Sequence, residues 1–138
     1  MLLKLDFSNE VPIYRQIHDQ IVMFIAGGYL NAGEKLPTIR ALANETGVNM
    51  MTINKAYQML KQEGHIYTDR RGGTMVAQQV AGKDDGQTAR QAVAALDGKA
   101  LSDMHLHAAE AKLSGMSRET WLDLCGNAFD HPGTEHPE

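Results

Sequence analysis

Residues 36–76 constrain the fold of this 138-residue chain more than any other segment. They contain two apolar patterns of helical spacing, and only Gly47 and Val48 separate the end of the first from Asn49, a candidate N-cap of the second. Gly47 can end a helix in the left-handed conformation, and a connection this short forces two helices to cross steeply. The segment therefore predicts a helix-turn-helix.

Two β-like runs follow the second of these helices. Residues 66–68 and 75–77 flank residues 69–74, a tip that contains two arginines and two glycines. Apolar and β-branched runs around a glycine-bearing connection are typical of a β-hairpin. A helix-turn-helix followed by a hairpin with a basic tip is a winged helix-turn-helix, which we predict for residues 1–77.

The other elements of this first region are predicted from periodicity and capping. A first helix is expected over residues 12–26, with Pro12 in its opening turn, and Thr38 is expected to cap the second helix. Residues 2–7 alternate loosely and predict a short edge strand paired with the hairpin. The third helix should turn one apolar stripe inward, formed by Ile53, Ala56, Tyr57 and Leu60.

The second half of the chain predicts a short helical region. Residues 78–86 are polar and indicate a linker, whereas residues 87–130 contain two helical patterns. Gly98 lies inside the first pattern and leaves one helix or two helices open over residues 87–114, of which we favour one. Gly115 should end that pattern, Ser117 should cap the last helix, and residues 131–138 predict a disordered tail. The predicted class is mainly α (α+β).

Charge is distributed unevenly along the chain. The net charge of −4 argues, taken alone, against a nucleic-acid partner. Residues 1–77 nevertheless hold eight Lys/Arg against seven Asp/Glu, and residues 78–138 hold five against ten, so the halves carry +1 and −5. Any binding to a polyanion must therefore come from local placement of cations in the first half.

The single cysteine, Cys125, excludes an internal disulfide and a cysteine-based zinc site, which fits a reducing compartment. Its apolar neighbours Trp121 and Leu124 predict that it belongs to a core. No apolar run approaches the roughly 18 residues of a membrane span, and the first residues do not resemble a signal peptide. We expect a soluble, cytoplasmic protein without a cofactor.

The third helix has the features of a DNA-reading element. An α-helix fits the major groove, where each base pair presents a distinct set of donors and acceptors. Asn54 would favour adenine, Lys55 would favour guanine, and Met51 would pack on a thymine methyl group. The residues expected to face DNA near the start of this helix are Asn49, Met50, Met51, Thr52, Asn54 and Lys55.

Two further places offer phosphate contacts. At the start of the second helix, free N–H groups, the Thr38 hydroxyl and the Arg40 guanidinium can bind a phosphate. On the predicted hairpin, Arg70 and Arg71 can enter the minor groove, where negative potential is concentrated. These cations would add affinity more than sequence discrimination.

Each of these residues also has a purely structural explanation. An isolated lysine or arginine is usually a solvated surface charge, which applies to Arg40 and Lys55 taken singly. Thr38 and Asn49 are helix caps first, and Arg70 with its neighbour can be a charged turn. The functional interpretation gains strength because these signals fall on one motif.

The six histidines raise the possibility of a metal site. Asp103 and His107 lie four residues apart and could share a metal on a helix, but a solvated helix face explains them better. No P-loop, Gly-x-Ser-x-Gly or His-Glu-x-x-His motif is present, so we predict neither an enzyme nor a metal protein.

A series of short motifs in register carries a family resemblance over residues 10–77. The motifs are Pro12-Ile13-Tyr14-Arg15-Gln16-Ile17, Gly33-Glu34-Lys35-Leu36-Pro37-Thr38-Ile39-Arg40-Ala41-Leu42-Ala43, Gly47-Val48-Asn49, Thr52-Ile53, Ala56-Tyr57, Leu60, Glu63-Gly64 and Arg71-Gly72-Gly73-Thr74-Met75-Val76. With these motifs the chain resembles the GntR family of bacterial transcription regulators. The remaining 61 residues are too few for a large effector domain, and the short helical appendage is similar to the YtrA-type subfamily, whose members are dimeric repressors often associated with transporter operons.

The resemblance also implies roles for individual residues. It places contacts to the DNA backbone at Thr38, Arg40 and Thr52. It places base reading at Met50, Met51 and Asn54, and wing contacts at Arg71, Gly72 and Gly73. The pair Met50-Met51 departs from the family pattern, in which many members have an arginine and a polar residue or Pro-Asn, so Lys55 or the wing would have to compensate.

We therefore expect a homodimeric repressor that binds a double-stranded DNA operator. Symmetric pairing would place two recognition helices about one DNA turn apart and predicts a pseudo-palindromic operator. The alternative is a winged-helix protein-interaction module without specific DNA binding; a small-molecule effector is compatible with the first hypothesis, but no pocket can be assigned from the sequence. The apolar residues expected in the dimer interface are Val93, Leu96, Ala100, Met104, Ala108, Trp121, Leu124 and Phe129.

Overall fold

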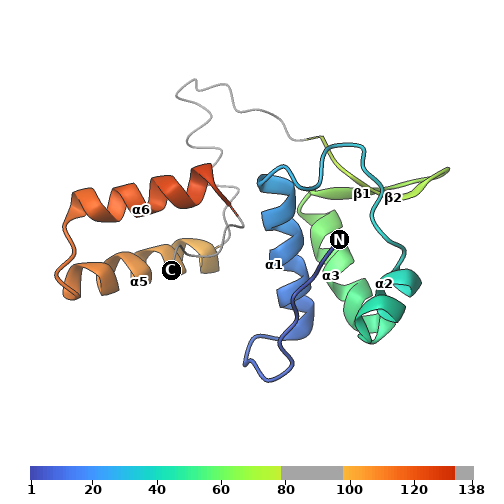
Figure 1. Ribbon diagram of the computed structural model, residues 1–138, viewed down its shortest axis with the longest axis horizontal. Helices are drawn as coiled ribbons and strands as arrows, with labels where there is room; N and C mark the ends of the chain where they lie inside the picture. The colour runs from blue at the N-terminus through green and yellow to red at the C-terminus, as the bar shows by residue number, and fades with distance from the viewer. Residues whose placement is uncertain (79–97, 133–138) are drawn as a thin grey trace. The chain divides into compact units, whose positions relative to one another are not determined.

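A computed structural model describes residues 1–78 and 98–132 of the chain (Figure 1). These residues form two compact units, an N-terminal unit that extends to Gln78 and a C-terminal unit made of two helices. The elements are α1 (Ile13–Ala26), α2 (Ile39–Thr46), α3 (Met50–Gln62), β1 (Ile66–Asp69), β2 (Gly73–Val76), α5 (Gly98–Leu113) and α6 (Arg118–Asp130). The predicted class, mainly α with a small β-hairpin wing, is confirmed.

The helix-turn-helix is built by the caps that the sequence predicts. The Thr38 hydroxyl accepts a hydrogen bond from the Ala41 N–H at 3.0 Å and so begins α2. Gly47 ends α2 with a φ of 73°. The Asn49 side chain then accepts from the Met51 N–H at 2.7 Å and begins α3. All three capping predictions are confirmed.

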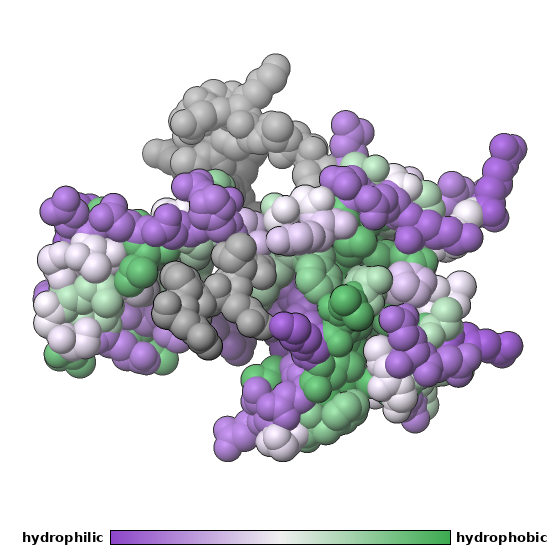
Figure 2. Space-filling model, in the orientation of Figure 1, coloured by the Kyte–Doolittle hydropathy of each residue, from purple (hydrophilic) through white to green (hydrophobic). Residues whose placement is uncertain are grey.

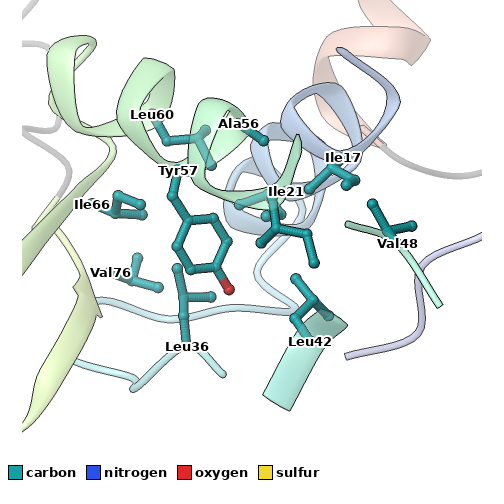
Figure 3. Close-up of a cluster of buried hydrophobic side chains, with 11 residues drawn as sticks. Ile17, Ile21, Leu36, Leu42, Val48, Ala56, Tyr57, Leu60, Ile66 and Val76 are labelled. Carbon is teal, nitrogen blue, oxygen red and sulfur yellow. The ribbon is translucent and has the colours of Figure 1, made fainter. Parts of the chain in front are cut away.

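Helix α3 is the centre of the N-terminal unit. It packs against α1, α2 and β1, with α1 and α2 on either side of it in Figure 1. Its predicted apolar stripe is buried, and Figure 3 shows this stripe meeting side chains from every other element of the unit. The core consists of Ile17, Ile21, Leu36, Leu42, Val48, Ile53, Ala56, Tyr57, Leu60, Ile66 and Val76.

Tyr57 contributes the one hydroxyl of this core. Its side chain is 1% exposed, and its hydroxyl donates a hydrogen bond of 2.8 Å to the Pro37 carbonyl oxygen. Burial disfavours the phenolate and raises the pKa of Tyr57 to about 12. The bond ties α3 to the chain just before α2, so it fixes the position of the helix-turn-helix in the unit.

The hairpin pairs β1 and β2 in antiparallel register, from Ile66 opposite Val76 to Asp69 opposite Gly73. The connection is therefore shorter than predicted, because Asp69, Gly73 and Thr74 belong to the strands and only residues 70–72 form the tip. We call β1, β2 and this tip the wing.

A short extended segment before α2 pairs with the outer side of β2. The Gly33 N–H donates to the Val76 carbonyl oxygen at 2.9 Å, and the Val76 N–H donates to the Glu34 carbonyl oxygen at 2.9 Å. The Leu36 N–H donates to the Thr74 carbonyl oxygen at 2.8 Å. Lys35 forms the bridge opposite Met75. The base of the wing is thus joined through backbone groups to the segment that enters α2.

The prediction of an edge strand over residues 2–7 is wrong. The Lys4 backbone exchanges two hydrogen bonds with the Gln20 side chain, at 2.8 and 2.7 Å, and the Asp6 backbone exchanges two with Gln16, both at 2.9 Å. A side-chain amide offers a carbonyl acceptor and N–H donors side by side, as a peptide strand does, so two glutamines of α1 take the place of a neighbouring strand.

His18 joins the far end of α3 to α1. It is 7% exposed, and its two ring nitrogens lie 2.8 Å from an Asp19 carboxylate oxygen and 2.6 Å from a Glu63 carboxylate oxygen. Glu63 is the C-cap of α3 and also lies 3.4 Å from the His65 ring. This cluster holds the C-terminal end of α3 against α1.

The described part of the C-terminal unit, α5 and α6, buries very little apolar surface. Ala111 is the one buried apolar residue among the described residues of α5 and α6. Gly115, with a φ of 89°, follows α5 as predicted, and the Ser117 hydroxyl accepts from the Thr120 N–H at 3.2 Å and caps α6. Cys125 is exposed, so its assignment to a core is wrong: its apolar neighbours in the sequence do not bury it within the described chain.

Several predictions fall outside the described residues. The linker, the first part of the helical pattern over residues 87–114, and nearly all of the predicted tail lie there, so the choice between one helix and two stays a prediction. The described part of that pattern begins at Gly98. No helix in the described ranges is long and apolar enough to cross a membrane.

Candidate nucleic-acid interface

The N-terminal half of α3 presents an exposed face opposite its buried stripe. Met50 and Met51 are 47% and 79% exposed, Asn54 and Lys55 are exposed as well, and Thr52 is half-buried. The first turn of α3 contains no acidic residue. This end of the helix therefore offers apolar contact, amide hydrogen bonding and one cation without a neighbouring negative charge.

Lys55 does not extend straight away from α3. Its Nζ atom lies 3.9 Å from the centroid of the Tyr14 ring, which belongs to the first turn of α1. An ammonium group over an aromatic face is attracted by the ring quadrupole. Tyr14 thus lies beside the candidate interface, a position that no local sequence pattern predicts.

The start of α2 combines a cap with a free cation. The Thr38 hydroxyl oxygen accepts the capping bond, which leaves the hydroxyl hydrogen able to donate to a phosphate oxygen. Arg40, in the first turn, is exposed, and that turn contains no acidic residue. The arrangement has the features of a helix N-terminus that binds a phosphate.

The wing tip carries two exposed arginines. The backbone N–H of Arg71 donates to the Asp69 carboxylate at 3.1 Å, which shapes the turn. The side chains of Arg70 and Arg71 are exposed. Gly72 is half-buried, and Gly73 adopts a φ of 88°, a left-handed conformation that disfavours other residues. The two glycines therefore shape the tip, and the two arginines supply its charge.

Lys35 is a further cation that the sequence analysis did not include in the site. A Cβ atom placed on Gly73 would lie 3.4 Å from the Lys35 Cε atom, so the lysine side chain runs along β2 toward the tip of the wing. Only the pairing between residue 35 and Met75 brings it there. Lys35 and Gly73 are 38 positions apart in the sequence, so no local sequence pattern predicts that they lie close together.

Residues 13–76 match the family described as bacterial regulatory proteins, gntR family. YtrA from Sulfolobus acidocaldarius, a solved GntR-family transcription factor, is 41% identical, with a TM-score of 0.55 over 67% of this chain and 93% of that one. This chain belongs to the GntR family. The family resemblance inferred from the sequence motifs is therefore confirmed.

Other proteins are also similar to this GntR-family member. The HTH-type transcriptional repressor YtrA of Bacillus subtilis (strain 168) is 36% identical over 77 residues, which cover 56% of this chain and 59% of YtrA. A transcriptional antiterminator from Listeria monocytogenes EGD-e is 25% identical and covers 100% of this chain and 98% of its own, with a TM-score of 0.72. The alignments span about three fifths of the Bacillus YtrA, 59%, and of a second Bacillus subtilis (strain 168) protein, the HTH-type transcriptional regulator YhcF, 60%.

The residues predicted for the dimer interface are partly visible in this GntR-family chain. Val93 and Leu96 lie outside the described residues. Ala108 and Trp121 are half-buried, whereas Ala100, Met104, Leu124 and Phe129 are exposed, the last three to 51%, 48% and 86%. Figure 2 shows apolar and polar side chains interspersed over α5 and α6 on the face in view.

Proposed function

We propose that this protein is a sequence-specific DNA-binding transcriptional regulator, a homodimeric repressor that binds a pseudo-palindromic operator. One observation carries the proposal. The exposed face of α3, from Asn49 to Lys55, is polar or apolar but not acidic, and it begins at a capped N-terminus. A recognition helix uses this part of its surface to meet base edges in the major groove.

Within this proposal the residues of the site divide into two roles. Met50, Met51 and Asn54 read bases: the methionines pack on thymine methyl groups, and Asn54 pairs with adenine. Backbone contacts come from Thr38, Arg40, Thr52 and the Asn49 cap, and the wing adds Arg70, Arg71, Gly72 and Gly73 at the minor groove. With Lys55 as the one cation of the first two turns of α3, most of the affinity comes from α2 and the wing.

The dimer is proposed from the C-terminal unit. Exposed apolar side chains on both α5 and α6, which include Leu106, Leu122 and Leu124, require a cover, and a second copy of the same unit supplies one. A symmetric dimer presents two recognition helices and doubles the number of phosphate contacts. The described acidic residues of the second half lie in α5 and α6, in a unit separate from the candidate interface, so they can coexist with DNA binding.

The test starts from a random pool of double-stranded DNA. We expect the full-length protein to enrich a pseudo-palindromic sequence, which is then used as the probe in mobility shifts. Arg40→Ala combined with Arg71→Ala should weaken binding roughly tenfold or more and lower the slope of log K against log salt by about two. Arg118→Ala, an exposed arginine of α6, is the matched control.

Two results would reject the proposal. The first is that the unaltered protein enriches no sequence. The second is that the double variant binds the enriched duplex with unchanged affinity and salt slope. Repression itself is checked with a reporter promoter that carries the enriched sequence: expression should fall when the protein is present in the cytoplasm and recover with the double variant.

A further inference from the structure

The contact between Tyr14 and Lys55 joins two elements that the fold brings together. Tyr14 lies in the first turn of α1, is half-buried and packs against the core. Lys55 lies on the exposed side of α3, and its ammonium nitrogen is 3.9 Å from the centroid of the Tyr14 ring. Since the core holds the ring in place, the lysine is the partner that adjusts to it.

The charge of Lys55 is held without being neutralised. Among the described residues, every ion pair involves other side chains, so no carboxylate lies within 4.0 Å of the Lys55 ammonium. A carboxylate partner would cancel the positive charge, whereas an aromatic face attracts an ammonium and leaves its charge and its outward N–H donors in place. Lys55 therefore remains able to bind a polyanion.

The direction of the contact matters for what Lys55 can reach. Its ammonium is drawn toward α1 and so lies to the side of α3. The side of a helix seated in the major groove faces the groove wall, which is lined by phosphates, whereas base edges lie on the groove floor. This geometry differs from the expectation that Lys55 reads guanine.

We propose that Tyr14 is a positioning residue that holds the Lys55 ammonium for a phosphate of the bound duplex, so that Lys55 adds affinity and not base discrimination. The inference rests on the proposed DNA-binding function. Lysine has large rotamer freedom, and part of it is already lost on the Tyr14 ring. Binding a phosphate then costs less conformational entropy than it would from a freely moving side chain.

The experiment is a double-mutant cycle on the full chain. Tyr14→Leu removes the ring, Lys55→Met removes the ammonium but keeps much of the aliphatic length, and the third variant combines them. The probe is the duplex enriched by the unaltered protein, and its affinity is measured over a series of salt concentrations. Tyr14→Phe restores an aromatic face, and Tyr29→Leu, at an exposed tyrosine after α1, is the control.

We expect Tyr14→Leu to weaken binding about two- to fivefold and Tyr14→Phe to bind as the unaltered protein does. In the Lys55→Met background, Tyr14→Leu should have no further effect, because the group that it positions is absent. Lys55→Met should lower the salt slope by about one and leave the enriched sequence unchanged, as expected for a phosphate contact.

Three outcomes would overturn the inference while the protein still binds DNA. They are an unchanged affinity for Tyr14→Leu, an equal loss from that substitution with and without Lys55, and a changed sequence preference for Lys55→Met. Failure of the unaltered protein to enrich any duplex would instead reject the proposed function. Circular dichroism checks that each variant folds, and Tyr14→Met, a second non-aromatic substitution, replaces Tyr14→Leu if the latter does not.

Discussion

The N-terminal and C-terminal units bury their apolar side chains in opposite ways. The first encloses eleven buried apolar residues around α3, and its helix ends, its wing and its N-terminal segment are all fixed by hydrogen bonds. The second has a capped α6 and a Gly115 turn after α5, but only Ala111 is buried among its described residues. Well-formed helix ends therefore do not by themselves bury an apolar face, and most helical stability in proteins comes from packing.

The comparison can be tested with the single tryptophan of the chain. Trp121 lies in α6, so its fluorescence reports on the C-terminal unit, whereas far-ultraviolet circular dichroism reports on both units. If the two units differ as described, changes in the core of the first should be costly and independent of protein concentration. Changes in the second should depend on protein concentration if, as proposed, a second copy of the unit covers its apolar side chains.

The largest effect is expected from the core of the N-terminal unit. Ile53→Ala removes a fully buried side chain and should lower the free energy of unfolding by about 4 kcal/mol, from the lost burial and the cavity that remains. Urea unfolding followed by circular dichroism measures this loss. Leu113→Ala, at a residue of α5 that is 87% exposed, should change it by less than about 0.5 kcal/mol. Equal losses at the two sites would contradict the contrast between the units.

The second effect concerns alkaline pH. The pKa of Tyr57 is raised from 10.0 to about 12, so the folded state favours the protonated phenol. The resulting stability is fully present below pH 10 and is lost as the pH rises through about 12, by up to about 3 kcal/mol.

Urea unfolding between pH 9 and 12 tests this prediction. The pH-dependent loss of stability should be smaller in Tyr57→Phe than in the unaltered protein, whereas Tyr67→Phe, at an exposed tyrosine of β1, should retain the full loss. The explanation fails if both variants lose stability in parallel with the unaltered protein over this range.

The third effect belongs to the C-terminal unit. Leu124→Ser combined with Phe129→Ser replaces two exposed apolar side chains of α6 and should raise the dissociation constant of the proposed dimer roughly thirtyfold, about 2 kcal/mol. Sedimentation and the concentration dependence of Trp121 unfolding measure it. Met23→Ser, at a half-exposed methionine of α1, is the control. An unchanged dissociation constant would place the dimer contact elsewhere.

The smallest effect comes from a matched pair of caps. Thr38 and Ser117 both begin a helix by accepting a hydrogen bond from the N–H three residues later, at 3.0 and 3.2 Å. Replacing either by alanine should cost about 1 kcal/mol. Thr38→Ala should lower the stability of the N-terminal unit. Ser117→Ala should lower the stability of the C-terminal unit, which Trp121 fluorescence reports. Each substitution should leave the other unit unchanged, and a loss in both would show that they unfold together.

The sequence predicts the local features of the fold well. Caps at Thr38, Asn49 and Ser117 and the buried stripe of α3 depend on residues within a few positions of one another, so short patterns reveal them. Predictions failed where the partner is distant or absent. Backbone groups at residues 4 and 6 bind glutamine side chains of α1, which no alternation pattern shows.

The same distinction holds for the candidate site. The exposed face of α3, Arg40 and the wing arginines follow from the motif, but Tyr14 and Lys35 become visible only when the chain is folded. Tyr14 lies 41 positions before Lys55, and Lys35 lies 38 positions before Gly73. Cys125 shows a second limit of sequence prediction. Periodicity identifies the apolar face of a helix, but it does not show whether another element covers that face.

The pairing of residues 33–36 with β2 affects how this protein can change during evolution. Its three hydrogen bonds, at Gly33, Val76 and Leu36, all run between backbone groups. Side chains at positions 34, 35 and 74 can therefore be exchanged without releasing the wing from the segment that leads into α2. The protein can thus acquire new contacts at the edge of its candidate DNA interface while the spacing between wing and helix-turn-helix is inherited unchanged.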